Sequence, residues 1–101
     1  MAQSLEDVIL SVWRQAMMEG ASSVEIEGHP YPIKSTQRRS LKQVDFRFEG
    51  KSLRGFGAES GYAITLGRDG QGRAGKKVMQ FWEDGRYVAV VSDGKVRLYQ
   101  S

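Results

Sequence analysis

Residues 77–100, KVMQFWEDGRYVAVVSDGKVRLYQ, carry the strongest indication of the fold class. Two Asp-Gly pairs, at residues 84–85 and 93–94, divide it into three runs rich in β-branched and aromatic residues. Asp-Gly readily supplies two successive residues at positive φ, as a tight type I′ hairpin turn requires. The pattern therefore predicts a three-stranded antiparallel meander with strands at 77–83, 86–92 and 95–100.

Upstream of the meander, the sequence predicts further strands. Residues 42–49, KQVDFRFE, alternate apolar and polar side chains, so Val44, Phe46 and Phe48 share one face of a half-buried strand. A turn is expected at Gly50-Lys51. Residues 24–27 predict a short strand that ends at Gly28. Residues 31–36 predict an edge strand, because the prolines at 30 and 32 cannot donate to a sheet ladder.

The N-terminal residues 4–19 predict a helix. Ser4 is a good N-cap, with Asp7 three residues later, and Gly20 is a natural stop. One apolar stripe recurs at helical spacing: Leu5, Ile9, Val12, Trp13, Ala16 and Met17. We therefore expect a single α+β domain over residues 1–101, with the helix packed on a mostly antiparallel sheet of about five strands.

Residues 55–75 contain seven glycines and predict a glycine-rich loop, with 62–66 as a candidate strand inside it. The run GQGRAGK at residues 70–76 fits both the dinucleotide-binding pattern G-x-G-x-x-G and most of a P-loop. Both motifs place phosphate at the start of a helix, whereas this loop leads into a predicted strand. Position 77 is also Lys rather than Ser or Thr. We therefore expect no nucleotide cofactor.

The residue types required for catalysis are scarce. The chain has no cysteine, which excludes disulfides, thiolate metal ligands and cysteine nucleophiles. The single histidine, His29, lies in a predicted turn, and no nucleophile–base–acid set is recognisable. We expect no catalytic residues, no metal and no cofactor, and the protein is more consistent with a binding protein than with an enzyme.

Hydropathy and composition also indicate the cellular compartment. No apolar run approaches the roughly 18 residues of a membrane span, and no basic region followed by an apolar stretch marks a signal peptide at the N-terminus. Together with the lack of cysteine, these features lead us to expect a cytoplasmic protein with no membrane partner.

Charge gives the strongest functional indication. The net charge is +3, but residues 34–77 alone hold eleven bases and four acids, a balance of +7. Lysine and arginine can neutralise phosphates, so this asymmetry predicts a basic face that binds nucleic acid or another polyanion. Because Phe46 and Phe48 are expected in the core, contact with the phosphate backbone is favoured over base readout. The expected binding residues are Arg38, Arg39, Lys42, Arg47, Lys51, Arg54, Arg73, Lys76 and Lys77.

Two alternatives remain open at this level. The basic residues can simply form solvated surface. The protein can also be an interaction or self-assembly module, such as a homo-oligomer, in which an edge strand or the helix pairs with a partner. Polyanion binding predicts an affinity that falls steeply with salt and with replacement of Arg38, Arg39 and Lys42. Self-assembly predicts a concentration-dependent oligomer that is indifferent to those changes.

Three stretches resemble a family of short bacterial proteins of unknown function: residues 4–16 (SLEDVILSVWRQA), 50–55 (GKSLRG) and 75–96 (GKKVMQFWEDGRYVAVVSDGKV). Between these flanks the family carries a segment like GLEQNP-x-T-x-SRWA, and residues 55–75 depart from it. One back-translation of residues 55–73, shifted by one nucleotide, restores that segment. A pair of compensating frameshifts in the coding DNA would therefore explain the departure and make the glycine motifs accidental. The resemblance implies no activity.

Overall fold

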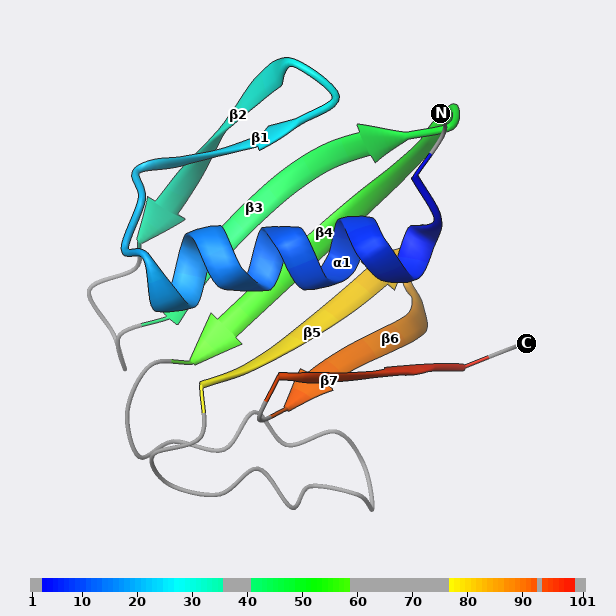
Figure 1. Cartoon of the computed structure of the whole chain (residues 1–101). Coiled ribbons are helices and arrows are strands. Elements are labelled where there is room, and N and C mark those ends of the chain that lie inside the picture. The colour runs from blue at the N-terminus through cyan, green and yellow to red at the C-terminus, as the bar shows by residue number, and fades with distance from the viewer. Residues whose placement is uncertain (1–2, 36–40, 59–76, 93, 100–101) are drawn as a thin grey trace.

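The computed structural model describes residues 3–35, 41–58, 77–92 and 94–99. An N-terminal helix, α1 (Leu5–Trp13), continues into a wider π-type turn, η1 (Arg14–Met18). Seven strands form one antiparallel sheet and neighbour one another in sequence order (Figure 1). The strands are β1 (Ser23–Ile26), β2 (His29–Ser35), β3 (Leu41–Phe48), β4 (Lys51–Ala58), β5 (Val78–Glu83), β6 (Arg86–Ser92) and β7 (Lys95–Leu98).

The helix begins and ends as its sequence predicts. The Ser4 hydroxyl accepts a hydrogen bond from the Asp7 backbone N–H at 3.1 Å, which satisfies one of the free donors of the first turn. Gly20 has φ +65°, the left-handed conformation that commonly stops a helix. The last turn is wider than expected. Its Ala16 carbonyl accepts a hydrogen bond from Lys42 Nζ at 3.0 Å, so a β3 side chain satisfies a helix-end acceptor.

Two-residue turns at positive φ join three of the hairpins. The predicted turn at Asp84-Gly85 is confirmed, with φ of 52° and 81°. The same conformation joins β1 to β2 at Glu27-Gly28 and β3 to β4 at Glu49-Gly50. Gly94 also has positive φ, whereas Asp93 lies outside the described residues. A non-glycine residue pays a steric penalty at positive φ, so the two Glu-Gly turns are less obvious from sequence than Asp-Gly.

The expected sheet of about five strands is too small, and the main omission is β4. The predicted glycine-rich loop begins too early, because Gly55 and Gly57 lie inside β4 and face the helix side of the sheet. A Cβ atom added at Gly55 would meet the Phe81 ring at 2.9 Å, and one at Gly57 would meet Met17 Sδ at 2.5 Å. These glycines are therefore strand residues that allow close packing. The candidate strand at 62–66 lies outside the described part of the chain.

The predicted edge strand at 31–36 is also corrected, because β2 pairs with both β1 and β3. Its two prolines lie in the half of β2 that pairs only with β1, opposite Ser23 and Glu25. The backbone groups of Glu25 face away from β2, towards the helix, so Pro30 lies where no ladder donor is needed. The edge strand at this end of the sheet is β1.

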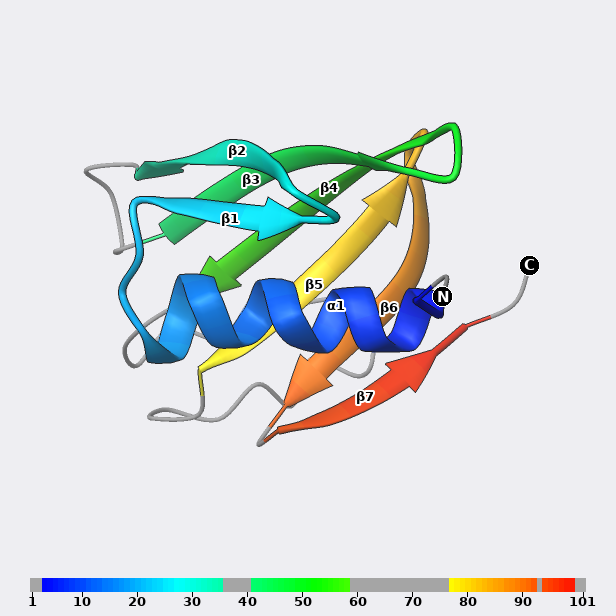
Figure 2. The same cartoon turned by 45° about the horizontal axis from the view of Figure 1, so that its top comes forward.

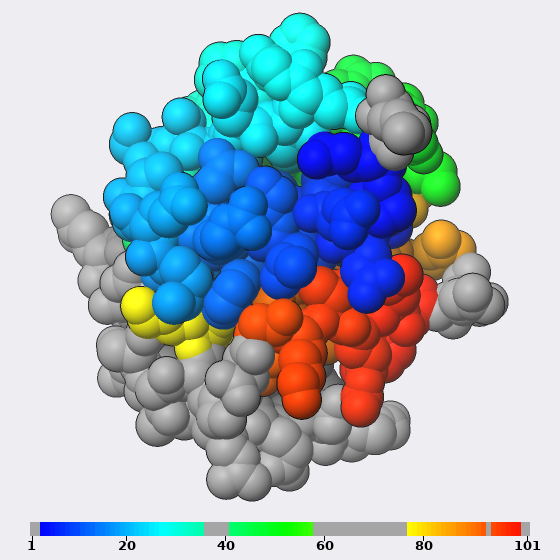
Figure 3. Space-filling model, viewed as in Figure 1, coloured from blue at the N-terminus to red at the C-terminus, as the bar shows by residue number. Residues whose placement is uncertain are grey.

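The helix closes the free edge of β1. The Gln15 side-chain amide donates to the Glu25 carbonyl at 3.2 Å and accepts from the Glu25 N–H at 2.9 Å. These two bonds imitate the pairing that a neighbouring strand would supply. Figures 1 and 2 show the helix lying across one face of the sheet, with the β1–β2 hairpin on one side and β7 on the other. In the space-filling view the helix fills the surface between them (Figure 3).

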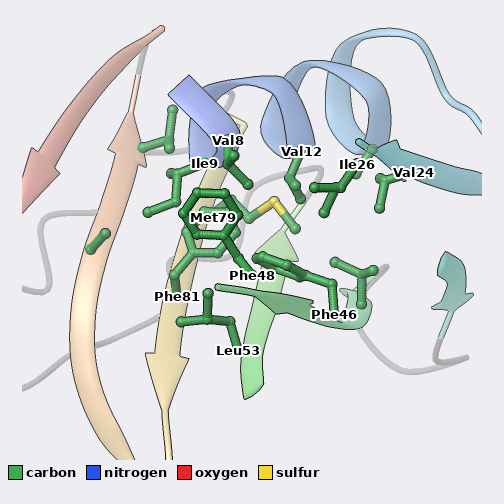
Figure 4. Close-up of a cluster of buried hydrophobic side chains, with 14 of the residues drawn as sticks. Val8, Ile9, Val12, Val24, Ile26, Phe46, Phe48, Leu53, Met79 and Phe81 are labelled. Carbon is green, nitrogen blue, oxygen red and sulfur yellow. The ribbon is translucent and has the colours of Figure 1, made fainter. Parts of the chain in front are cut away.

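The core lies between the helix and the sheet (Figure 4). The helix contributes Val8, Ile9 and Val12, which are fully buried, and the strands contribute Phe46 and Phe81, whose rings meet edge to face at 6.1 Å. Phe46 and Phe48 are buried, as the alternation in β3 predicts. Because every second strand residue faces this core, the intervening residues lie on the opposite surface of the sheet, which we call the outer face.

Candidate functional site

The outer face carries a row of side chains that crosses the central strands. The register pairs Asp45 on β3 with Arg54 on β4, Arg54 with Trp82 on β5, and Trp82 with Tyr87 on β6. Tyr99, just after β7, continues the row, because its ring centroid lies 4.8 Å from that of Tyr87. An ion pair at one end thus adjoins three aromatic side chains, and we call this set the outer row.

An open depression of about 770 Å³ lies over one part of the outer row. Most of its lining comes from β3 and β4. Tyr31 on β2, Trp82 on β5 and the turn between β5 and β6 supply the rest. Its lining residues are Tyr31, Asp45, Phe46, Arg47, Ser52, Leu53, Arg54, Phe56, Trp82, Asp84 and Gly85. The volume lies in the range of small-molecule and cofactor sites, but the depression is open rather than enclosed.

Opposite charges meet in the lining of this depression. Arg54 Nε lies 2.6 Å from Asp45 Oδ1, and the other carboxylate oxygen accepts from Gln43 Nε2 at 3.3 Å. The Arg54 and Asp45 side chains remain 55% and 44% exposed. An ion pair in this setting contributes only about 0.2–1 kcal/mol to stability. An incoming anion can therefore compete with Asp45 for the guanidinium at little cost to the fold.

The aromatic part of the outer row is held by its own ring contacts. The Trp82 and Tyr87 ring centroids are 5.2 Å apart with the planes tilted by 46°, and the Tyr87 and Tyr99 planes differ by 31°. The sequence patterns did not assign these residues to a site. A usable signal existed, because the two-residue turn at Asp84-Gly85 places Trp82 close to Tyr87 across the hairpin.

The structure divides the predicted basic residues between the two faces. Arg47 and Arg54 lie on the outer face and line the depression. Lys42 lies on the helix side, where its ammonium group binds the Ala16 carbonyl. Lys51 is exposed at the start of β4, opposite the core residue Phe48.

The remaining predicted residues add little to this surface as described. Lys77 is partly buried just before β5, and its backbone carbonyl accepts a hydrogen bond from the Trp13 indole. Four predicted residues lie outside the described ranges: Arg38, Arg39, Arg73 and Lys76. Of the five predicted cations that the structure describes, two therefore share the depression.

No metal centre is formed by the residues that the structure places. Within the described ranges there is no cluster of three or more His, Cys, Asp or Glu side chains suited to a metal ion. His29 is exposed at the start of β2. Among the same residues, no helix has the length and apolar character needed to cross a membrane.

No known protein offers a comparison for the outer row. No family model, curated protein or solved structure matches the chain. The resemblance to a short bacterial family therefore stays a prediction.

Proposed function

We propose that this protein is a small non-enzymatic binding protein that holds a polyanion, foremost nucleic acid, on the outer face of its sheet. The observation that supports the proposal is the placement of Arg47 and Arg54 in one open depression. Arginine presents a planar fork of donors that suits phosphate oxygens. The +7 balance of residues 34–77 adds a long-range attraction for anions. The lack of cysteine fits the reducing cytoplasm as the compartment.

The Asp45–Arg54 ion pair makes this proposal specific. In the free protein the carboxylate neutralises the guanidinium that a phosphate would contact. A bound phosphate must displace Asp45 or share Arg54 with it. Asp45 therefore weakens polyanion binding, and its removal should strengthen binding while costing the fold less than about 1 kcal/mol.

Fluorescence anisotropy with labelled single-stranded and duplex oligonucleotides, from about 50 to 200 mM salt, tests the proposal. We expect affinity to fall steeply with salt. Arg47→Ala and Arg54→Ala should each weaken binding and lower the salt slope by about 0.7–0.9 for every phosphate that the variant no longer neutralises. Asp45→Asn should tighten binding.

The matched control is Arg14→Ala. Arg14 is exposed on the helix side, where it makes an exposed ion pair with Glu19 at 3.8 Å. This variant removes the same charge from a different face, so it should leave the affinity nearly unchanged. Equal loss of binding in Arg14→Ala and Arg54→Ala would show that only net charge matters. Absence of binding at the lowest salt would refute the proposal.

A second candidate function, strand-mediated self-association, is favoured by the edge at β7. This strand is the last in the sheet, and among the described residues no strand pairs with its outer edge. Leu98 on β7 is 45% exposed. By contrast, Gln15 closes the edge at β1. An open edge with an exposed apolar side chain is a template for pairing with a second copy.

Sedimentation equilibrium over a range of protein concentrations tests self-association. The Tyr99 N–H donates to the Val88 carbonyl, so alternation turns the Val96 N–H towards the open edge. Val96→Pro would remove that donor without breaking the pairing between β6 and β7. If wild type forms dimers, Val96→Pro should be monomeric. A monomer at every concentration would exclude this candidate.

A further inference from the structure

We infer that the nucleic acid held by the outer face is single-stranded and that its unpaired bases stack on Trp82 and Phe56. This inference rests on the proposed function and names its ligand class. The sequence alone favours contact with the phosphate backbone, because the aromatic residues of β3, Phe46 and Phe48, alternate onto the core side. The structure adds aromatic side chains from β4 and β5 to the surface that carries Arg47 and Arg54.

The first support is the position of two aromatic rings in the depression. Phe56 and Trp82 both line it, and both side chains are partly exposed. Their strands are neighbours, and Gln80 on β5 pairs with Phe56. Partly exposed aromatic side chains on a sheet are the usual stacking platform for unpaired bases, and every base offers a ring face to them.

The second support is the distance between the aromatic and the basic groups. Arg54 and Trp82 are direct cross-strand partners on the same face. Cβ atoms of such pairs lie about 4.5–5.5 Å apart. A nucleotide whose base lies on Trp82 therefore has its phosphate within reach of Arg54, and Arg47 lines the same depression.

The third support is the set of ring contacts that hold Trp82 in place. Trp82 on β5 contacts Tyr87 on β6, and Tyr87 contacts Tyr99 just after β7, so the three rings brace one another. A braced ring loses little side-chain freedom when a base stacks on it, which lowers the entropic cost of binding. In duplex nucleic acid the bases are already stacked and paired inside the helix, so the platform would bring no gain there.

The test compares three labelled probes of equal length in anisotropy titrations at fixed salt. They are a single-stranded 20-residue DNA oligonucleotide, its duplex, and an abasic oligonucleotide with the same phosphate backbone and no bases. Stacking contributes roughly 1–3 kcal/mol per base, so loss of the bases should weaken binding by about 5-fold or more. We expect the single strand to bind tightest and the abasic strand to bind weakly.

Variants test whether the base-dependent part of the affinity comes from Trp82 and Phe56. Trp82→Leu and Phe56→Leu keep an apolar side chain but remove the ring. Each should weaken single-strand binding by about 5-fold or more and leave the abasic probe unaffected. Trp13→Phe is the matched control, because Trp13 lies on the helix side with its indole bonded to the Lys77 carbonyl. Circular dichroism and thermal midpoints verify that each variant is folded, and Phe56→Leu keeps the test available if Trp82→Leu unfolds.

The outcomes separate this inference from the proposed function. Equal affinity for the abasic and base-containing strands, with salt dependence retained, would overturn base stacking while polyanion binding stands. Duplex binding as tight as single-strand binding would likewise overturn base stacking and leave polyanion binding standing. Failure of all three probes to bind at low salt would overturn both. Binding that loses its base dependence in Trp82→Leu but not in Trp13→Phe supports the inference.

Discussion

The replacement Gly55→Ala should destabilise the protein, although alanine is normally the better strand residue. A Cβ atom at this position would lie 2.9 Å from Phe81 Cε2 and 3.0 Å from Met79 Cε, closer than ordinary contact at 3.4–4 Å. Phe81 and Met79 are both fully buried, so neither can move into solvent. The added methyl group must therefore displace the Phe81 ring and the end of the Met79 side chain, or push β4 away from β5.

The expected magnitude follows from two opposing effects. Overpacking a well-filled core costs about 1–3 kcal/mol. Replacing glycine with alanine also reduces the entropy of the unfolded chain, which returns about 0.4–1 kcal/mol. The middles of these ranges, about 2 and about 0.7 kcal/mol, give an expected net loss of about 1.3 kcal/mol in the free energy of unfolding. For a domain of this size, each kcal/mol corresponds to a fall of about 4–8 °C in Tm.

Urea titration and thermal melting, both followed by circular dichroism, measure this loss. Ser52→Ala is the matched control, because Ser52 lies on the same strand but is exposed on the outer face, so its replacement should stay within about 0.5 kcal/mol. The double variant Gly55→Ala with Phe81→Leu should show a favourable coupling of about 0.5 kcal/mol or more. Unchanged or increased stability of Gly55→Ala would refute the packing argument for this glycine.

Three further predictions concern the helix and the turns. Gln15→Ala should lower the free energy of unfolding by about 1 kcal/mol and speed hydrogen exchange at the Glu25 amide, because it removes both bonds that close the β1 edge; unchanged exchange at that amide would contradict this role. Lys42→Met should keep the side-chain volume but leave the Ala16 carbonyl without this donor, at a cost of about 1 kcal/mol in urea titrations; a neutral result would mean that solvent replaces the ammonium group. Glu49→Asn should stabilise the protein by roughly 0.5–1 kcal/mol, and so raise the Tm, because asparagine tolerates the φ of 54° better than glutamate; Glu25→Gln, at an exposed position on β1, serves as a control for the charge change.

The parts of the fold that could be predicted from the sequence are those set by neighbouring residues. Ser4 and Asp7 define the helix start, and Asp84-Gly85 defines a hairpin, because each needs only a few consecutive residues. The strand β4 could not be predicted this way, because Gly55 and Gly57 have low strand propensity. Their reason for being in a strand is contact with Phe81 and Met17, which are distant in sequence.

The candidate site shows the same limit. Alternate residues of a strand face opposite sides of the sheet, and Lys42 falls on the same side as the buried residues Val44 and Phe46. The sequence pattern therefore already places Lys42 and Arg47 on different faces and does not support one continuous basic face. The outer row, however, depends on the registers of five strands and on a shift between Phe81 and Trp82 in the pairing of β5 with β6. The local pattern at Asp84-Gly85 specifies only the pairing of Trp82 with Tyr87, and the other registers depend on contacts between residues distant in sequence.

The amide of Gln15 gives the sheet two unlike ends. Polymerisation by strand addition needs two exposed borders on every molecule, so that each copy can both accept and offer a strand. This chain occupies one border with its own helix, through the two bonds to Glu25. Pairing through β7 would join two molecules around a twofold axis and leave a helix-covered border at both ends. Association through this sheet would therefore stop at a pair instead of growing into a fibre.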